Sequence, residues 1–117
     1  MISPNIFFLM ILLTVFFIRL SVYLVPNKDV LIFGKVIHHM WFGVLFVLFA
    51  WLVPTSIPYV TGIILGIGFG LMADQFVYML LGGGGDDKYW SQSSILGAIS
   101  MLVLLFLLRT PVLNFFI

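Results

Sequence analysis

The chain has 117 residues, of which 63% are hydrophobic and 8% are charged, and its net charge at pH 7 is +1. A soluble domain carries about 25% charged residues, so this composition excludes a water-soluble fold and predicts a single integral membrane domain. The sequence contains no basic patch of the kind that binds nucleic acid, so no nucleic-acid partner is expected. The absence of cysteine excludes disulfides and thiolate metal ligands.

Hydrophobic runs separated by proline and glycine predict four membrane-spanning helices, because a bilayer core about 30 Å thick needs roughly 20 apolar helical residues. The first run lacks the positively charged start of a secretory signal peptide, so we expect it to be a membrane helix. The predicted fold class is all-α, a polytopic bundle of four antiparallel transmembrane helices. The predicted spans are residues 5–25, 30–53, 59–81 and 94–110.

Four spans place both termini on one side of the membrane, the terminal side, and the first and third loops on the other, the loop side. Lys28, Lys35 and Lys88 belong to the loop side, whereas Arg109 belongs to the terminal side. The positive-inside rule then predicts a cytoplasmic loop side and external termini. Within the fourth helix, Pro111 is expected to cause a kink or an end.

Ionisable side chains of three predicted helices reach similar depths. At 1.5 Å per residue, Arg19 lies about 9 Å, Asp74 about 11 Å, and His38 and His39 about 12–13 Å from the loop side. Charged groups inside a membrane are costly and usually mark a functional site. The alternative is an internal ion pair of Arg19 with Asp74 that only holds the helices together.

A stripe of glycines leads to Asp74 on the third predicted helix. Gly62, Gly66 and Gly70 recur every four residues, and such a stripe lets two helix backbones approach closely. It favours packing within the monomer, with a homodimer interface as the alternative. Asp74 is therefore expected to face another helix, and Tyr78 follows on the same face one turn later.

The histidines and the carboxylate suggest a metal site. Two histidines and one carboxylate form a ligand set typical of zinc or iron, so the predicted ligands of a divalent metal are His38, His39 and Asp74, joined by Asp87. The same His38, His39 and Asp74 are the candidate acid–base groups.

The remaining candidate residues suit an anionic amphiphile such as a membrane lipid. Arg19 and Lys35 would repel a cation but can hold an anionic headgroup. The predicted substrate-binding residues are Arg19, Lys35, Tyr78, Tyr89 and Trp90, with Tyr89, Trp90 and Asp87 forming a lid. This site is compatible with a metal-dependent membrane hydrolase.

Two other functions are compatible with the same residues. The first is a proton-coupled transporter or channel subunit, dimeric through the glycine stripe, that relays protons through Asp74 and a histidine. The second is a non-catalytic membrane assembly protein whose polar layer fixes the register of the helices.

Three motifs, IHHMWFG (37–43), GFGLMADQFVYML (68–80) and YWS (89–91), resemble those of a group of small prokaryotic membrane proteins. That group has a His-His-x-x-x-Gly helix, a glycine-rich helix ending in Asp-Glu and a Tyr-Trp-Ser loop. The resemblance covers about residues 35–95 and implies a prokaryotic cell membrane, but no particular activity. Gln75 stands where the resemblance implies glutamate, which removes one carboxylate from the expected site.

Overall fold

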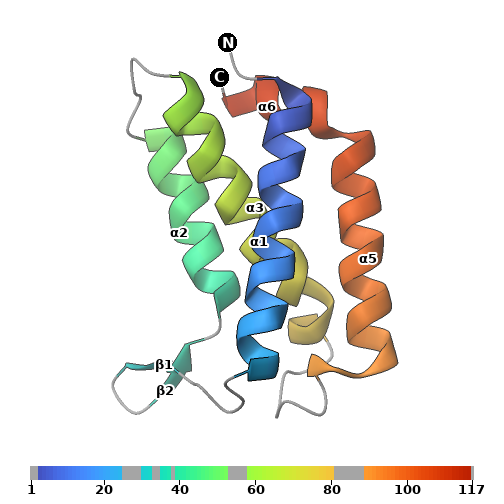
Figure 1. The fold of residues 1–117 in the computed structure, drawn as a ribbon. Coiled ribbons are helices and arrows are strands. Elements are labelled where there is room, and N and C mark those ends of the chain that lie inside the picture. Colours follow the sequence, from blue (N-terminus) through green and yellow to red (C-terminus); the bar gives the residue numbers. More distant parts are fainter. Residues whose placement is uncertain are drawn as a thin grey trace.

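The computed structural model describes residues 3–24, 30–32, 35–37, 39–52, 58–80 and 89–116, with His39, Pro58 and both strands described by their backbone alone. The described part is mainly α-helical, in agreement with the predicted class (Figure 1). Its elements are α1 (Pro4–Leu24), β1 (Val30–Ile32), β2 (Lys35–Ile37), α2 (His39–Leu52), α3 (Pro58–Leu80), α5 (Gln92–Leu107) and α6 (Arg109–Phe116).

Two helices, α1 and α3, are long and apolar enough to cross a membrane, and the bent pair α5 and α6 makes a third if the two form one span. With 21 and 23 residues, α1 and α3 exceed the roughly 20 that a bilayer core requires. The apolar helix α2 has only 14 residues, or about 21 Å at 1.5 Å per residue. The chain therefore has the helices of a membrane protein.

The helix α3 is the centre of the bundle and packs against α1, α2 and α5 (Figure 1). Figure 1 shows α1 and α3 running in one direction and α2 and α5 in the other. The β1–β2 hairpin lies at the loop side, and α6 lies at the terminal side near the start of α1. Leu113 of α6 is fully buried with Phe7 of α1, so α6 closes the core at this side.

The predicted second span, residues 30–53, is wrong over its first part. There β1 and β2 pair antiparallel, with Val30 opposite Ile37, and α2 begins only at His39. Both strands are rich in the β-branched residues that favour extended backbone. Hydrophobicity alone does not distinguish a short apolar strand from part of a helix.

The predicted fourth span, 94–110, is also corrected. The helix α5 ends at Leu107, and α6 continues after a bend of 72°. Pro111 explains the position of the bend, because it has no N–H to donate to the carbonyl of Leu107, whereas proline is tolerated in the first turn of a helix. The residues after Pro111 are thus a helix that packs on the bundle.

Glycines of α3 let α1 approach closely. A Cβ added to Gly66 would lie 2.6 Å from the Cβ of Met10, and one added to Gly70 would lie 2.6 Å from the Cβ of Thr14. These contacts advance together along both chains, as parallel helices in register require. The face of α3 that carries the predicted stripe is therefore covered by α1 of the same chain.

Candidate functional site

The parallel packing of α1 and α3 places Arg19 beside Asp74, one turn beyond the contact of Thr14 with Gly70. The Nε atom of Arg19 donates a hydrogen bond to Oδ1 of Asp74 at 2.6 Å. The side chain of Asp74 is fully buried and that of Arg19 is 13% exposed. The expectation that Asp74 faces another helix agrees with this ion pair.

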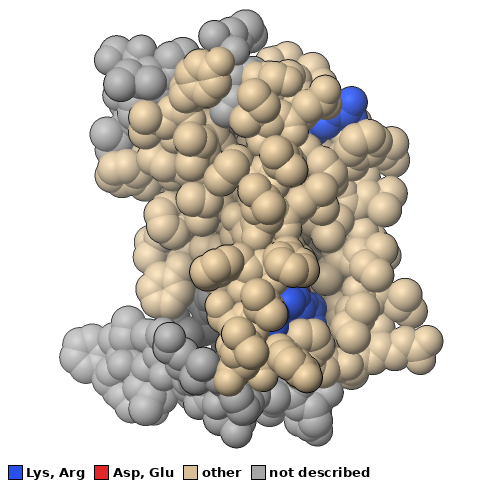
Figure 2. Space-filling model, viewed as in Figure 1, with Lys and Arg blue, Asp and Glu red and all other residues tan. Residues whose placement is uncertain are grey.

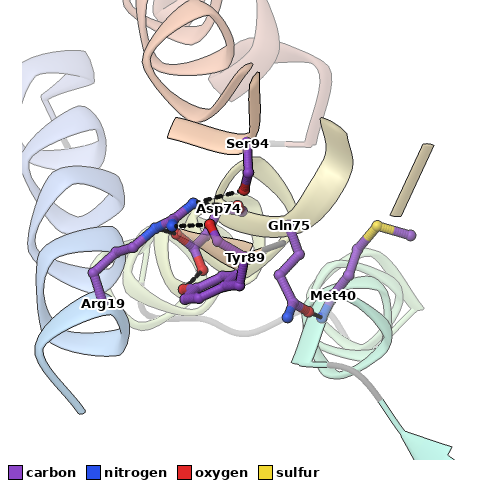
Figure 3. Close-up of polar contacts among 6 residues, drawn as sticks. All are labelled: Arg19, Met40, Asp74, Gln75, Tyr89 and Ser94. Atoms are coloured by element: carbon purple, nitrogen blue, oxygen red, sulfur yellow. Dashed lines mark hydrogen bonds and ion pairs between the residues drawn. The ribbon is translucent and has the colours of Figure 1, made fainter. Parts of the chain in front are cut away.

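The guanidinium of Arg19 also reaches the start of α5 (Figure 3). Its Nη1 donates to the carbonyl of Tyr89 at 2.8 Å, and its Nη2 donates to the carbonyl of Asp74 at 3.2 Å and to Oγ of Ser94 at 3.4 Å. Four of its five N–H groups are thus accounted for. We call Arg19, Asp74, Tyr89 and Ser94 the Arg19 cluster; it joins α1, α3 and α5.

Tyr89 contacts both members of the ion pair. Its hydroxyl donates to Oδ2 of Asp74, and its ring lies 3.9 Å from the guanidinium carbon of Arg19. Burial, followed by the neighbouring Asp74 carboxylate, raises the pKa of the Tyr89 phenol far above its usual range. The phenol therefore remains protonated and acts as a hydrogen-bond donor. The side chain of Tyr89 is buried in this arrangement, and the lid that it would form with Trp90 and Asp87 stays a prediction.

Aromatic rings surround the cluster on the loop side. Trp90, which is partly exposed, lies with its ring 5.2 Å from the Arg19 guanidinium and packs edge-to-face on Tyr23. Tyr78, which lies on the same face of α3 as Asp74, is buried and packs edge-to-face on Tyr89, with ring centroids 5.5 Å apart. The rings shield the ion pair and hold the connection to α5 against α1.

A second polar contact joins α3 to α2. Gln75 is buried, and its Oε1 accepts a hydrogen bond of 3.0 Å from the backbone N–H of Met40 (Figure 3). This N–H belongs to the first turn of α2, where helical N–H groups lack partners within the helix. Gln75, which stands where the resemblance implies glutamate, thus caps the first turn of α2.

The buried polar side chains of the described residues all have hydrogen-bond partners. On the face shown in Figure 2, basic atoms reach the surface in two separate places, one toward each side of the bundle, and no acidic atom of a described residue is visible. Asp74 is hidden because its partners enclose it.

Several predicted site residues fall outside this description. His38 and Asp87 lie outside the described residues, and His39 and Lys35 are described by their backbone alone. Over the described part of the chain, no three metal-ligating side chains come together. The metal site that includes His38, His39 and Asp87 therefore stays a prediction.

The depth estimated for the histidines does not hold. It assumed a continuous helix from Val30, whereas a hairpin separates Val30 from α2, and His39 is the first residue of α2. His39 is therefore at a helix start, next to the N–H that Gln75 caps. The meeting of Arg19 with Asp74 does not depend on this correction.

Sequence reasoning missed three partners. The roles of Tyr89 as a donor to Asp74, of Ser94 as an acceptor for Arg19, and of Gln75 as a cap were not anticipated. The N-cap of α5 is Ser91, whose side chain accepts from the N–H of Ser94. A usable signal was present, since a polar side chain in an apolar helix needs a partner.

No family model, curated protein or solved structure matches this chain. The resemblance drawn from the three motifs accordingly stays an expectation, and function is argued from the site alone.

Proposed function

We propose that the chain is a four-span integral membrane protein with an assembly role instead of a catalytic one. In this proposal the bent α5–α6 pair forms one span, and the shorter apolar helix α2 forms another. In this proposal the Arg19 cluster fixes α1, α3 and α5 on the loop side. The complete pairing of Asp74, whose two oxygens accept from Arg19 and Tyr89, is the observation that supports it.

The pairing bears directly on the chemistry available to Asp74. A general base must take up a proton, and a metal ligand must offer a lone pair to a cation. Both oxygens of Asp74 already accept hydrogen bonds. The guanidinium of Arg19, whose Nε lies 2.6 Å from Oδ1 of Asp74, would repel a cation placed beside this carboxylate. This geometry favours a role for Asp74 as the partner of Arg19.

The cost of the ion pair supports the same conclusion. Two buried charges gain little over apolar side chains, but removing one of them leaves the other uncompensated at a cost of about 3–5 kcal/mol. Such a pair specifies which faces of the helices pack against each other. Buried polar groups have this role in other proteins, where they fix the register of packed helices.

The test is the Asp74→Asn variant, reconstituted in liposomes and examined for proton flux, metal content and stability. We expect lowered stability, with metal content and proton permeability equal to those of the wild type. A wild-type proton flux or bound metal that disappears in a variant that remains folded would contradict the proposal. The matched control is Asn114→Asp, an exposed position on α6.

A second candidate function is a metal-assisted site acting on an amphiphile on the loop side. The observation that favours it is the partial exposure of Arg19, whose fifth N–H has no acceptor among the described residues. In this function His38, His39 and Asp87 hold the metal, and Arg19 with Lys35 holds the headgroup.

Elemental analysis of protein purified without chelator tests this second candidate. About one zinc or iron per chain, absent from the His38→Ala/His39→Ala double variant, would support it. Metal at the same level in both proteins, or in neither, would reject it.

A further inference from the structure

The bend between α5 and α6 creates an apolar groove at the terminal side. Because the helix axis turns by 72° after Leu107, α6 leaves the line of α5 and packs on α1, and the ring of Phe116 at its end contacts Phe69 of α3. The groove has a volume of about 320 Å³, near the lower end of the range of about 300–1,000 Å³ typical of ligand pockets. All its lining residues are apolar: Phe69, Leu108, Pro111, Val112, Phe115 and Phe116.

A basic residue stands at the same bend. Arg109 is the first residue of α6; its Nε donates to Oδ1 of Asn5 at 3.0 Å and its Nη1 to the carbonyl of Phe106 at 2.6 Å. Its guanidinium carbon lies 4.2 Å from the centre of the Phe106 ring. These contacts orient the guanidinium but leave three of its N–H groups without an acceptor among the described residues.

Among the described residues, no acidic side chain balances the charge of Arg109. The four acidic residues of the chain are Asp29, Asp74, Asp86 and Asp87. Asp74 pairs with Arg19, and the other three belong by sequence to the connections of the loop side. A positive charge at a membrane surface with no acidic neighbour attracts anionic lipid headgroups.

We propose that this bend binds an anionic phospholipid from the leaflet of the terminal side. An acyl chain fills the groove, and the phosphate accepts hydrogen bonds from Arg109. The planar guanidinium suits this role because two parallel N–H groups match two phosphate oxygens. The inference goes beyond the proposed function, since it concerns the opposite side of the bundle and none of the Arg19 cluster.

The experiment is photolabelling in nanodiscs, using phosphatidylglycerol or phosphatidylcholine with a diazirine in the acyl chain, and mapping of the labelled peptides by mass spectrometry. We expect phosphatidylglycerol to label residues 105–116 several-fold more than phosphatidylcholine does. Arg109→Gln should remove this excess. Val112→Phe, which fills the groove, should lower labelling by both lipids, whereas Leu104→Phe, exposed on α5 outside the groove, should not.

Equal labelling by the two lipids would overturn the proposal, as would an excess that persists in Arg109→Gln. Labelling that Val112→Phe leaves unchanged would overturn the placement of the acyl chain. The comparison of the two lipids on the wild-type protein needs no variant, so a poorly folded variant cannot obscure it. Failure here leaves the proposed function untouched, because that function is tested through Asp74 on the loop side.

Discussion

The two arginines whose side chains the structure describes lie on opposite sides of the bundle and differ in what surrounds them. Arg19 is mostly buried, paired with a carboxylate and bonded to α3 and the start of α5. Arg109 is partly exposed and bonded only to an amide oxygen and a carbonyl. The first guanidinium is neutralised within the chain, whereas the second keeps its charge available.

This difference teaches that the same side chain can serve the fold in one place and a ligand in another. A buried charge in a membrane requires an internal partner, and Arg19 has one in Asp74. A charge at the membrane surface can instead be satisfied by water and headgroups, which leaves Arg109 free for recognition. Substitution of Arg19 and substitution of Arg109 should therefore change the stability of the protein by very different amounts.

The largest expected effect is that of Arg19→Met. It should lower the free energy of unfolding by about 3–5 kcal/mol, because it leaves Asp74 buried without a compensating charge. Arg109→Met should change stability by no more than about 0.5 kcal/mol, as is usual for surface positions. Unfolding in mixed micelles of increasing dodecyl sulfate content, followed by tryptophan fluorescence, measures both. Equal losses would remove the distinction between the two arginines.

The next effect tests the packing that brings Arg19 to Asp74. Gly70→Ala should cost about 1–3 kcal/mol, the range for overpacked positions, because the new Cβ meets the side chain of Thr14 at 2.6 Å and the carbonyl of Ile11 at 3.0 Å. The exposed Thr110→Ala on α6 is the control and should be nearly neutral. The same unfolding assay applies, and a neutral Gly70→Ala would mean that α1 is not held as closely as described.

A smaller effect isolates one hydrogen bond of the cluster. Tyr89→Phe keeps the ring over Arg19 but removes the donor to Asp74, so stability should fall by about 1–2 kcal/mol. Tyr23→Phe, at an exposed position, should have no measurable effect. A Tyr89→Phe protein as stable as the wild type would show that the hydroxyl adds nothing to the ion pair.

The smallest effect concerns alkaline pH. The raised pKa of Tyr89 means that the folded chain keeps this proton while the unfolded chain loses it above about pH 10. Stability should be independent of this group below that pH and fall above it, by up to about 1.4 kcal/mol per pH unit. Comparing unfolding at pH 8 and pH 11 should show a smaller fall in Tyr89→Phe than in the wild type. An equal fall in both proteins would show that Tyr89 does not cause the loss of stability at high pH.

The sequence predicted the parts of the fold that depend on long apolar runs and on charge burial. The helices around Arg19 and Asp74 are of this kind, and the glycines every four residues correctly indicated that Asp74 faces another helix. The glycines could not show which helix packs on them, because a stripe of small residues fits a helix of the same chain and a second copy of the chain equally well. Contact with Met10 and Thr14 of α1 decides this in the structure.

The segment before α2 could not be predicted in the same way. Residues 30–37 are as apolar as a membrane helix, and only their β-branched content favours extended backbone. The polar partners Tyr89, Ser94 and Gln75 were also hidden, because their contacts join positions that are distant in sequence or lie on different helices. The pattern of neighbouring residues in the sequence contains no information about contacts between such distant positions.

A double-mutant cycle of Arg19→Met and Asp74→Asn, measured by unfolding in mixed micelles, tests the central claim most directly. If the two side chains form a buried pair that fixes the helices, each single variant should be strongly destabilised. The double variant should then recover part of the loss, since neither charge remains uncompensated. Losses that simply add in the double variant would show that Arg19 and Asp74 act independently and would contradict the account.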